Sequence, residues 1–195
     1  MAVQSLTACS TLLVGEARWM LLPIPKVAST LLKRLAVIAD GREPFEGAAF
    51  GETKPALAIH QAQNHGLQTL SQLSEADQKS WTNNPHALRL AVTRHPGERL
   101  LSFWHDKLHL ADPAYAPLNG SVQAARRKDQ SEPCRFSDFL SYLSDHWELL
   151  QSDGHLTPQH QFLGQSDLFN LRLDRSQLVK ELPKKLKSFL PAERL

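Results

Sequence analysis

The chain has 195 residues and is poor in the features that mark several classes of protein. Its two cysteines, Cys9 and Cys134, are too few for the disulfide framework of a small secreted domain. Its formal net charge is only +2, so we expect no nucleic-acid partner, and any basic function must be local. No apolar run approaches the roughly 18 residues that a membrane-spanning helix needs. We therefore expect a single cytoplasmic domain over residues 1–195, with no stable insertion into a membrane.

The N-terminal segment lacks the pattern of a signal peptide. Residues 5–9, Ser-Leu-Thr-Ala-Cys, resemble a lipoprotein cleavage site, but no Lys or Arg precedes them. The apolar stretch before Cys9 is also too short for the hydrophobic region of a signal peptide. We therefore expect residues 1–17 to form a flexible N-terminal segment.

Strand and helix patterns alternate along the rest of the chain. Apolar runs predict strands at residues 18–24 and 87–93, an extended segment at 55–60 and a last strand within 162–173. Helical spacing predicts helices over 29–39, 66–81 with a fresh start at Ser74, 96–108, 136–147 and 176–190. Residues 112–133 are expected to form an exposed excursion, and residues 151–161 a polar loop. The alternation predicts an α/β fold of three layers, in which helices flank a central, mainly parallel sheet.

The helix predicted over residues 29–39 should bury one face. Its apolar residues recur at helical spacing, whereas Lys33 and Arg34 are expected to point to water. The predicted buried set consists of Leu31, Leu32, Leu35, Ile38 and Ala39.

A first anion-binding motif lies where the strand at 18–24 meets this helix. Lys26 follows the apolar run, and Ser29 and Thr30 stand at the helix start, where backbone N–H groups are unpaired and carry partial positive charge. The motif lacks the glycines of a triphosphate-binding loop, so its turn suits a single phosphate or sulfate-bearing group. The alternative is a plain strand–turn–helix with a capping serine and a solvated Lys26.

A second anion-binding motif runs from Thr93 to Ser102. Arg94 ends a strand and offers a planar fork that suits a phosphate, and the Ser102 hydroxyl can complete the contact. Arg99 is either a further partner or a brace for the helix, and Arg94 itself could belong to a structural ion pair. Both motifs follow strands, and parallel sheets bind ligands at the carboxyl ends of their strands. Together they suggest one ligand with phosphates at both ends.

The two motifs carry a resemblance to a known family. Residues 25–30, Pro-Lys-Val-Ala-Ser-Thr, resemble the 5′-phosphosulfate-binding loop of sulfotransferases that use 3′-phosphoadenosine-5′-phosphosulfate (PAPS). Residues 94–102 resemble their 3′-phosphate-binding pattern, Arg-x-Pro-x-x-Arg-Leu-x-Ser. Over about residues 18–165 the chain is similar to the Golgi-type carbohydrate sulfotransferases of the chondroitin and HNK-1 branch, although it lacks their paired cysteines within 148–161.

The resemblance implies a PAPS-dependent sulfotransferase with a P-loop-like fold, which needs no metal and releases adenosine 3′,5′-bisphosphate. It implies that Lys26 is catalytic and stabilises the leaving group, and that Arg94 and Ser102 hold the 3′-phosphate. It also implies an acceptor hydroxyl, with a carbohydrate as the first candidate. The implied residues of the 5′-phosphosulfate site are Pro25, Lys26, Val27, Ala28, Ser29 and Thr30.

A general base for the acceptor hydroxyl is sought among the histidines, which titrate near neutral pH. His60 is the first candidate, because related enzymes place a base or an acceptor contact between the two motifs, and His65 and His146 come next. His105 and His109 have the i, i+4 spacing of zinc ligands, but spacing places no third ligand. The cluster Arg126–Lys128 either attracts an anionic acceptor or is solvated.

Two other functions are compatible with the motifs. One is a nucleotide-binding protein without catalysis. The other is a nucleotide-dependent phosphoryl transferase, which the missing glycines and the lack of an evident magnesium-binding carboxylate disfavour. The sequence leaves the acceptor and the oligomeric state open.

Overall fold

The computed structural model describes residues 5–15, 18–42, 59–60, 65–125, 134–164 and 167–187. The chain divides into two compact units. The sheet unit comprises Met1–Thr93 and Gln159–Leu195, and the helical unit comprises Arg94–Pro158. The single domain expected over residues 1–195 stays a prediction.

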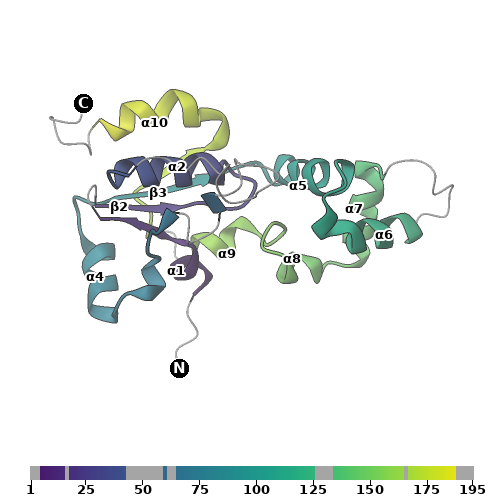
Figure 1. The fold of residues 1–195 in the computed structure, drawn as a ribbon, viewed down its shortest axis with the longest axis horizontal. Coiled ribbons are helices and arrows are strands. Elements are labelled where there is room, and N and C mark those ends of the chain that lie inside the picture. The colour runs from purple at the N-terminus through teal and green to yellow at the C-terminus, as the bar shows by residue number, and fades with distance from the viewer. Residues whose placement is uncertain are drawn as a thin grey trace. The chain divides into compact units, whose positions relative to one another are not determined.

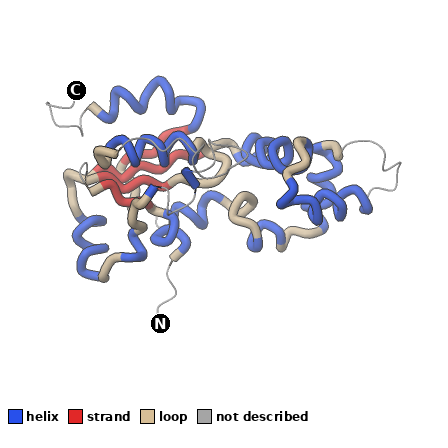
Figure 2. The backbone as a smooth tube through the Cα atoms, in the orientation of Figure 1, coloured by secondary structure: helices blue, strands red, loops and turns tan. Residues whose placement is uncertain are grey.

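The sheet unit is built on a four-stranded sheet in the order β1-β2-β3-β4. The strands are β1 (Leu12–Val14), β2 (Trp19–Leu22), β3 (Leu88–Thr93) and β4 (Leu171–Asp174). β2, β3 and β4 are parallel, and only the β1–β2 pair is antiparallel among these strands. The strands gather in the red part of the tube in Figure 2. The prediction of an α/β fold with a mainly parallel sheet is confirmed.

Helices cover both faces of this sheet (Figure 1). One face carries α2 (Ser29–Ala39) and α10 (Leu178–Leu186), and the other carries α1 (Leu6–Ser10), α4 (Glu75–Asn83) and α9 (Gln159–Leu163). Side chains alternate between the faces along each strand, so Leu12 and Val14 join the large core, while Leu13 packs in a smaller cluster with Met20 and Leu70. Strands buried on both faces read as continuous apolar runs, and β2 is buried at every residue.

The described part of the N-terminal segment is ordered, which differs from the flexible segment expected over residues 1–17. Ser5 caps α1 by accepting a hydrogen bond from the Ala8 N–H at 3.2 Å. β1 follows and pairs with β2, and its three residues are buried. A three-residue strand carries too little periodic signal to be read from sequence, and its order depends on the pairing with β2.

Helix α2 is rotated relative to the prediction. Leu32, Ala36 and Val37 are buried, whereas Leu31 and Ile38 are 49% and 54% exposed. Lys33 and Arg34, expected in water, are half-buried instead. Val27 is fully buried in the turn that leads directly into α2, so the helix starts from an anchored residue.

Several other segments differ in detail from the sequence prediction. The helix expected over 66–81 is split into the 3₁₀ turn η3 (Leu70–Gln72) and α4, and the fresh start at Ser74 is confirmed, since its hydroxyl accepts from the Asp77 N–H at 3.2 Å. The polar loop expected at 151–161 is interrupted by the end of α8 (Leu149–Ser152) and the start of α9. In the C-terminal part, η6 (Arg175–Gln177) precedes α10, which contains Pro183.

The helical unit packs around Phe103. It contains α5 (Pro96–Trp104), the π-helical turn η4 (His105–His109), η5 (Pro113–Tyr115), α6 (Ala116–Ala125), α7 (Phe136–Asp145) and α8. Phe103 is fully buried, with its ring centroid 5.5 Å from that of Phe139 and 5.3 Å from that of Tyr115. The excursion expected over 112–133 is therefore wrong for residues 113–125, which are helical and bury Val122 against this core. Residues 126–133 lie outside the described residues.

Gly164 provides a test of the sheet unit. It follows α9 with a φ of +58°, and a Cβ built there would lie 2.5 Å from the Thr7 hydroxyl on α1. We expect Gly164→Ala to lower the free energy of unfolding by at least about 1–2 kcal/mol, because alanine is strained in the left-handed region and would also displace Thr7.

The matched control is Gly120→Ala in α6, where a Cβ meets nothing within 4 Å. We expect it to raise the free energy of unfolding by up to about 1 kcal/mol, because alanine favours helix over glycine. Guanidinium unfolding followed by circular dichroism measures both variants. Equal stability of the Gly164 variant and the wild type would contradict the packing of α1 against α9.

Candidate functional site

The turn at the carboxyl end of β2 has an unusual backbone. Lys26 and Ala28 have φ values of +64° and +56°, a left-handed conformation that non-glycine residues rarely adopt. Ile24 and Val27 are fully buried, and the Val27 N–H donates to the Ile24 carbonyl at 3.2 Å. These two apolar anchors hold the turn in place. Positive φ at alternate residues is the pattern that turns successive N–H groups toward one side, where they can receive an anion.

Helix α2 starts directly from this turn without a side-chain cap. Its N-cap is Ala28, whose side chain makes no capping hydrogen bond. The alternative of a capping serine is therefore wrong, because Ser29 is the first helical residue rather than the N-cap. The N-terminus of a helix carries partial positive charge and donates N–H groups, so this start can hold a phosphate together with the hydroxyls of Ser29 and Thr30.

His60 contacts the same motif. Its Nε2 lies 2.9 Å from the Thr30 hydroxyl, which joins the candidate base to a residue of the predicted 5′-phosphosulfate site. Ile59 and His60 form a 3₁₀ turn, and residues 55–58 of the predicted extended segment lie outside the described residues.

The other two candidate bases are placed differently. His65 is 5% exposed, and its Nδ1 accepts from the Leu67 N–H at 3.1 Å. Burial lowers the pKa of His65, and the positive charges of Lys33 and Arg42 lower it further. His146 belongs to the helical unit, where its ring stacks on Tyr142 with centroids 4.0 Å apart. Of these three histidines, His60 is the one that we take forward as the candidate base, because it is hydrogen-bonded to a predicted site residue.

The second motif begins where β3 ends. β3 runs parallel to β2, with Leu22 opposite Ala91, so both strands end at the same edge of the sheet. Arg94 follows directly and is the first residue of the helical unit. Its side chain is 14% exposed and forms an ion pair with Glu98, with Nε 3.3 Å from Oε2.

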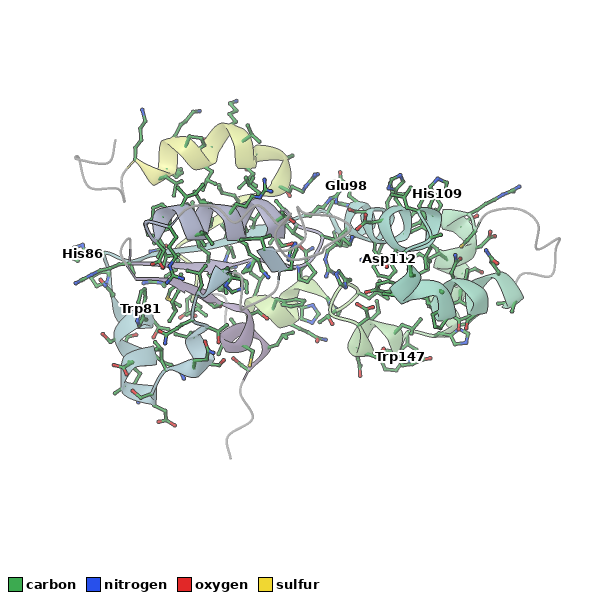
Figure 3. The ribbon with its side chains drawn as sticks, in the orientation of Figure 1. Trp81, His86, Glu98, His109, Asp112 and Trp147 are labelled. Atoms are coloured by element: carbon green, nitrogen blue, oxygen red, sulfur yellow. The ribbon has the colours of Figure 1, made fainter. Side chains whose placement is uncertain are left out.

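Glu98 and Ser102 lie on one side of α5, because residues four apart are neighbours on a helix. Arg94 precedes the helix and reaches this side through its ion pair with Glu98. Glu98 is largely exposed at the start of α5 (Figure 3), and Ser102 is half-buried. An ion pair with an exposed carboxylate contributes little, so Glu98 is a weak competitor for any phosphate that Arg94 binds.

Arg99 acts as a brace. Its side chain is 4% exposed and donates from Nη1 to the Thr157 carbonyl at 2.9 Å and from Nη2 to the Gly154 carbonyl at 3.3 Å. Burial lowers the pKa of Arg99 to about 10, against the opposing effect of the Asp153 carboxylate. Of the two roles left open for Arg99, these contacts support the structural one.

The turn that Arg99 holds contains a polar cluster that the sequence did not reveal. Nδ1 of His155 lies 2.9 Å from the Tyr115 hydroxyl and 3.2 Å from Oδ1 of Asp153, and the His155 N–H donates to the same oxygen at 2.7 Å. Burial alone would raise the pKa of Asp153, but the hydrogen bonds from His155 and Tyr115 outweigh it and hold the pKa at about 2. Burial raises the pKa of Tyr115, as does Asp153.

This cluster predicts an acid-sensitive helical unit. An unfolded aspartate has a pKa of about 3.9, so the depressed pKa of Asp153 stabilises the fold above about pH 4, and this contribution is lost as the pH falls toward 2. We expect Asp153→Asn to remove that part of the acid-dependent loss of stability. Denaturant unfolding between pH 6 and about pH 2.5 measures it.

Asp145→Asn, at an exposed position of α7, serves as the control and should keep the wild-type dependence. Superimposable stability–pH curves for the wild type and Asp153→Asn would contradict the assigned hydrogen bonds.

The remaining sequence features add no site. His105 and His109 stack within η4 with ring centroids 5.5 Å apart, and in the part of the chain that is described no group of three His, Cys, Asp or Glu residues gathers around a common point. The basic cluster at 126–128 lies outside the described residues. Among the described helices, none has both the length and the apolar character needed to cross a membrane.

Comparison with known proteins defines the family. The model of the sulfotransferase family matches residues 13–190. The chain therefore belongs to the sulfotransferase family, which confirms the resemblance at the level of the family. No curated protein and no solved structure matches the chain.

Proposed function

We propose that the chain transfers the sulfuryl group of PAPS to the hydroxyl of an acceptor, with a carbohydrate as the acceptor class. The main support for the proposal is the turn between β2 and α2 in a member of the sulfotransferase family. This turn contains Lys26 and two left-handed residues, and it leads into a helix that has no side-chain cap. The chemistry of this donor set fits the 5′-phosphosulfate end of PAPS. A cytoplasmic location stays a prediction.

In this proposal each motif holds one end of the donor. The N–H groups at the start of α2, with Pro25, Val27, Ala28, Ser29 and Thr30 around them, bind the 5′-phosphate. Arg94 and Ser102 bind the 3′-phosphate, and Arg94 then exchanges the Glu98 carboxylate for the phosphate. A donor without the 3′-phosphate loses this charge-assisted contact and is rejected.

Sulfuryl transfer needs positioning and charge stabilisation more than covalent help. The acceptor oxygen forms a bond to sulfur as the bond between sulfur and the bridging oxygen of PAPS breaks, which releases adenosine 3′,5′-bisphosphate. Lys26 stabilises the negative charge that develops on the leaving phosphate. The acceptor proton passes to a ring nitrogen of His60, which Thr30 holds beside the motif.

Donor binding tests the two motifs by calorimetry with adenosine 3′,5′-bisphosphate. We expect Lys26→Ala and Arg94→Ala each to weaken binding about 10- to 100-fold, because each removes a charge-assisted contact worth roughly 1.5–3 kcal/mol. Adenosine 5′-monophosphate should bind more weakly than the bisphosphate to the wild type, and Arg94→Ala should remove that preference.

Two variants complete this experiment. Lys79→Ala, at an exposed position of α4, should bind the bisphosphate as the wild type does. Glu98→Gln should bind it slightly more tightly, because the competing carboxylate is gone. Wild-type affinity in both Lys26→Ala and Arg94→Ala would overturn the proposed donor site.

The role of His60 is tested by turnover with labelled PAPS and a panel of monosaccharide acceptors. We expect His60→Ala to lower kcat about 100-fold or more with unchanged affinity for adenosine 3′,5′-bisphosphate, and to remove the acidic limb of the pH–rate profile. His86→Ala is the matched control, because His86 is exposed in the turn before β3 and so lies at the opposite end of that strand from Arg94 (Figure 3). It should leave turnover unchanged. An unaltered pH–rate profile in His60→Ala would exclude His60 as the base.

A further inference from the structure

A pocket of about 270 Å³ lies in the sheet unit beside the turn that follows β2. It is lined by the end of α1, by Pro23 and Pro25, by Lys33 of α2 and by His60 and His65. Lys26, Ser29 and Thr30 are not among its lining residues, although His60 at its rim is bonded to Thr30. The pocket therefore adjoins the proposed donor loop and shares Pro25 with it, while the proposed phosphate-binding side chains lie outside its lining.

The charge of this pocket is positive. Lys33 is half-buried on α2, and burial lowers its pKa. Lys33 and Arg42 both lower the pKa of the buried His65, so the positive potential extends through this region. Arg42 also donates to the His65 carbonyl at 3.0 Å and is paired with Asp40 at 2.9 Å, which leaves Lys33 as the cation that faces the pocket. Among the described residues that line the pocket, none is acidic.

The walls of the pocket are preorganised. Thr69 and Gln72 form a capping box, in which the Thr69 N–H donates to the Gln72 side-chain oxygen at 2.7 Å. Leu12 and Phe162 add buried apolar surface. The volume lies just below the range of roughly 300–1,000 Å³ that is typical of sites for drug-sized ligands, so the pocket suits a compact ligand such as a single sugar ring.

We propose that this pocket binds the acidic group of a compact, hydroxylated acceptor, with Lys33 as the residue that pairs with its carboxylate or sulfate. The inference rests on the proposed sulfotransfer and specifies its acceptor. A hydroxyl of the same ligand then lies at the His60 rim, next to the donor loop. Lys33 acts here as a specificity-determining residue, because a neutral acceptor of the same shape leaves a half-buried ammonium without an anionic partner.

The experiment compares matched sugars by nuclear magnetic resonance, in the presence of saturating adenosine 3′,5′-bisphosphate. The probes are methyl β-glucuronide, methyl β-galacturonide and glucose 6-sulfate, with methyl β-glucoside as the neutral partner. We expect at least one anionic sugar to shift the amide signals of Lys33, Leu67 and Thr69, and to bind at least tenfold more tightly than the neutral sugar. Lys33→Met, which keeps the apolar stem, should abolish this preference, and Lys79→Met should retain it.

The same titration separates the two proposals. Normal binding of the bisphosphate to Lys33→Met is expected, because Lys33 is not assigned to the donor. If the bisphosphate binds but no anionic sugar is preferred, or if Lys33→Met keeps the preference, the acceptor pocket is wrong and the proposed transferase stands. If an anionic sugar binds at the pocket but the bisphosphate does not bind at all, the proposed function fails and the acceptor role fails with it.

Discussion

The turn between β2 and α2 is the constraint on which the rest of the proposed site depends. Two left-handed residues, Lys26 and Ala28, are held there by the burial of Ile24 and Val27. Left-handed backbone at non-glycine residues costs roughly 1–2 kcal/mol each, so the surrounding core must supply the stability that the turn itself lacks. Because the strain is stored at the start of a helix with no side-chain cap, we interpret it as preorganisation for an anion.

The same turn also lies beside the residues of the proposed acceptor pocket and the proposed base. It leads into α2, where Lys33, expected on the solvent face, forms part of the wall of a pocket. It also presents the Thr30 hydroxyl to His60. This one turn thus connects three residues with proposed roles: Lys26 at the leaving group, His60 as the base and Lys33 at the acceptor. In the helical unit, Arg99 performs the corresponding structural task by bracing the turn that contains Gly154 and Thr157.

The sequence predicted what local patterns determine and missed what distant contacts determine. β2 and β3 were predictable because buried parallel strands are continuous apolar runs, and the start of α4 was predictable because Ser74 is a capping residue. β1 was missed because its three residues are ordered only by pairing with β2. The helical state of α6 depends on the core around Phe103, and Tyr115 contacts His155, which is forty positions later in the chain, so neither leaves a local signal. The rotation of α2 was missed because its apolar residues allow two overlapping stripes, and the local pattern does not select between them.

The most direct test of the central claim is a single titration of the isotope-labelled chain with adenosine 3′,5′-bisphosphate. The signals to follow are the backbone amide of Ser29 and the guanidinium Nε–H of Arg94. If one donor molecule joins the two motifs, both signals shift along the same binding curve and saturate at one equivalent of ligand. A shift at only one of them, or two curves with different dissociation constants, would contradict a common donor site.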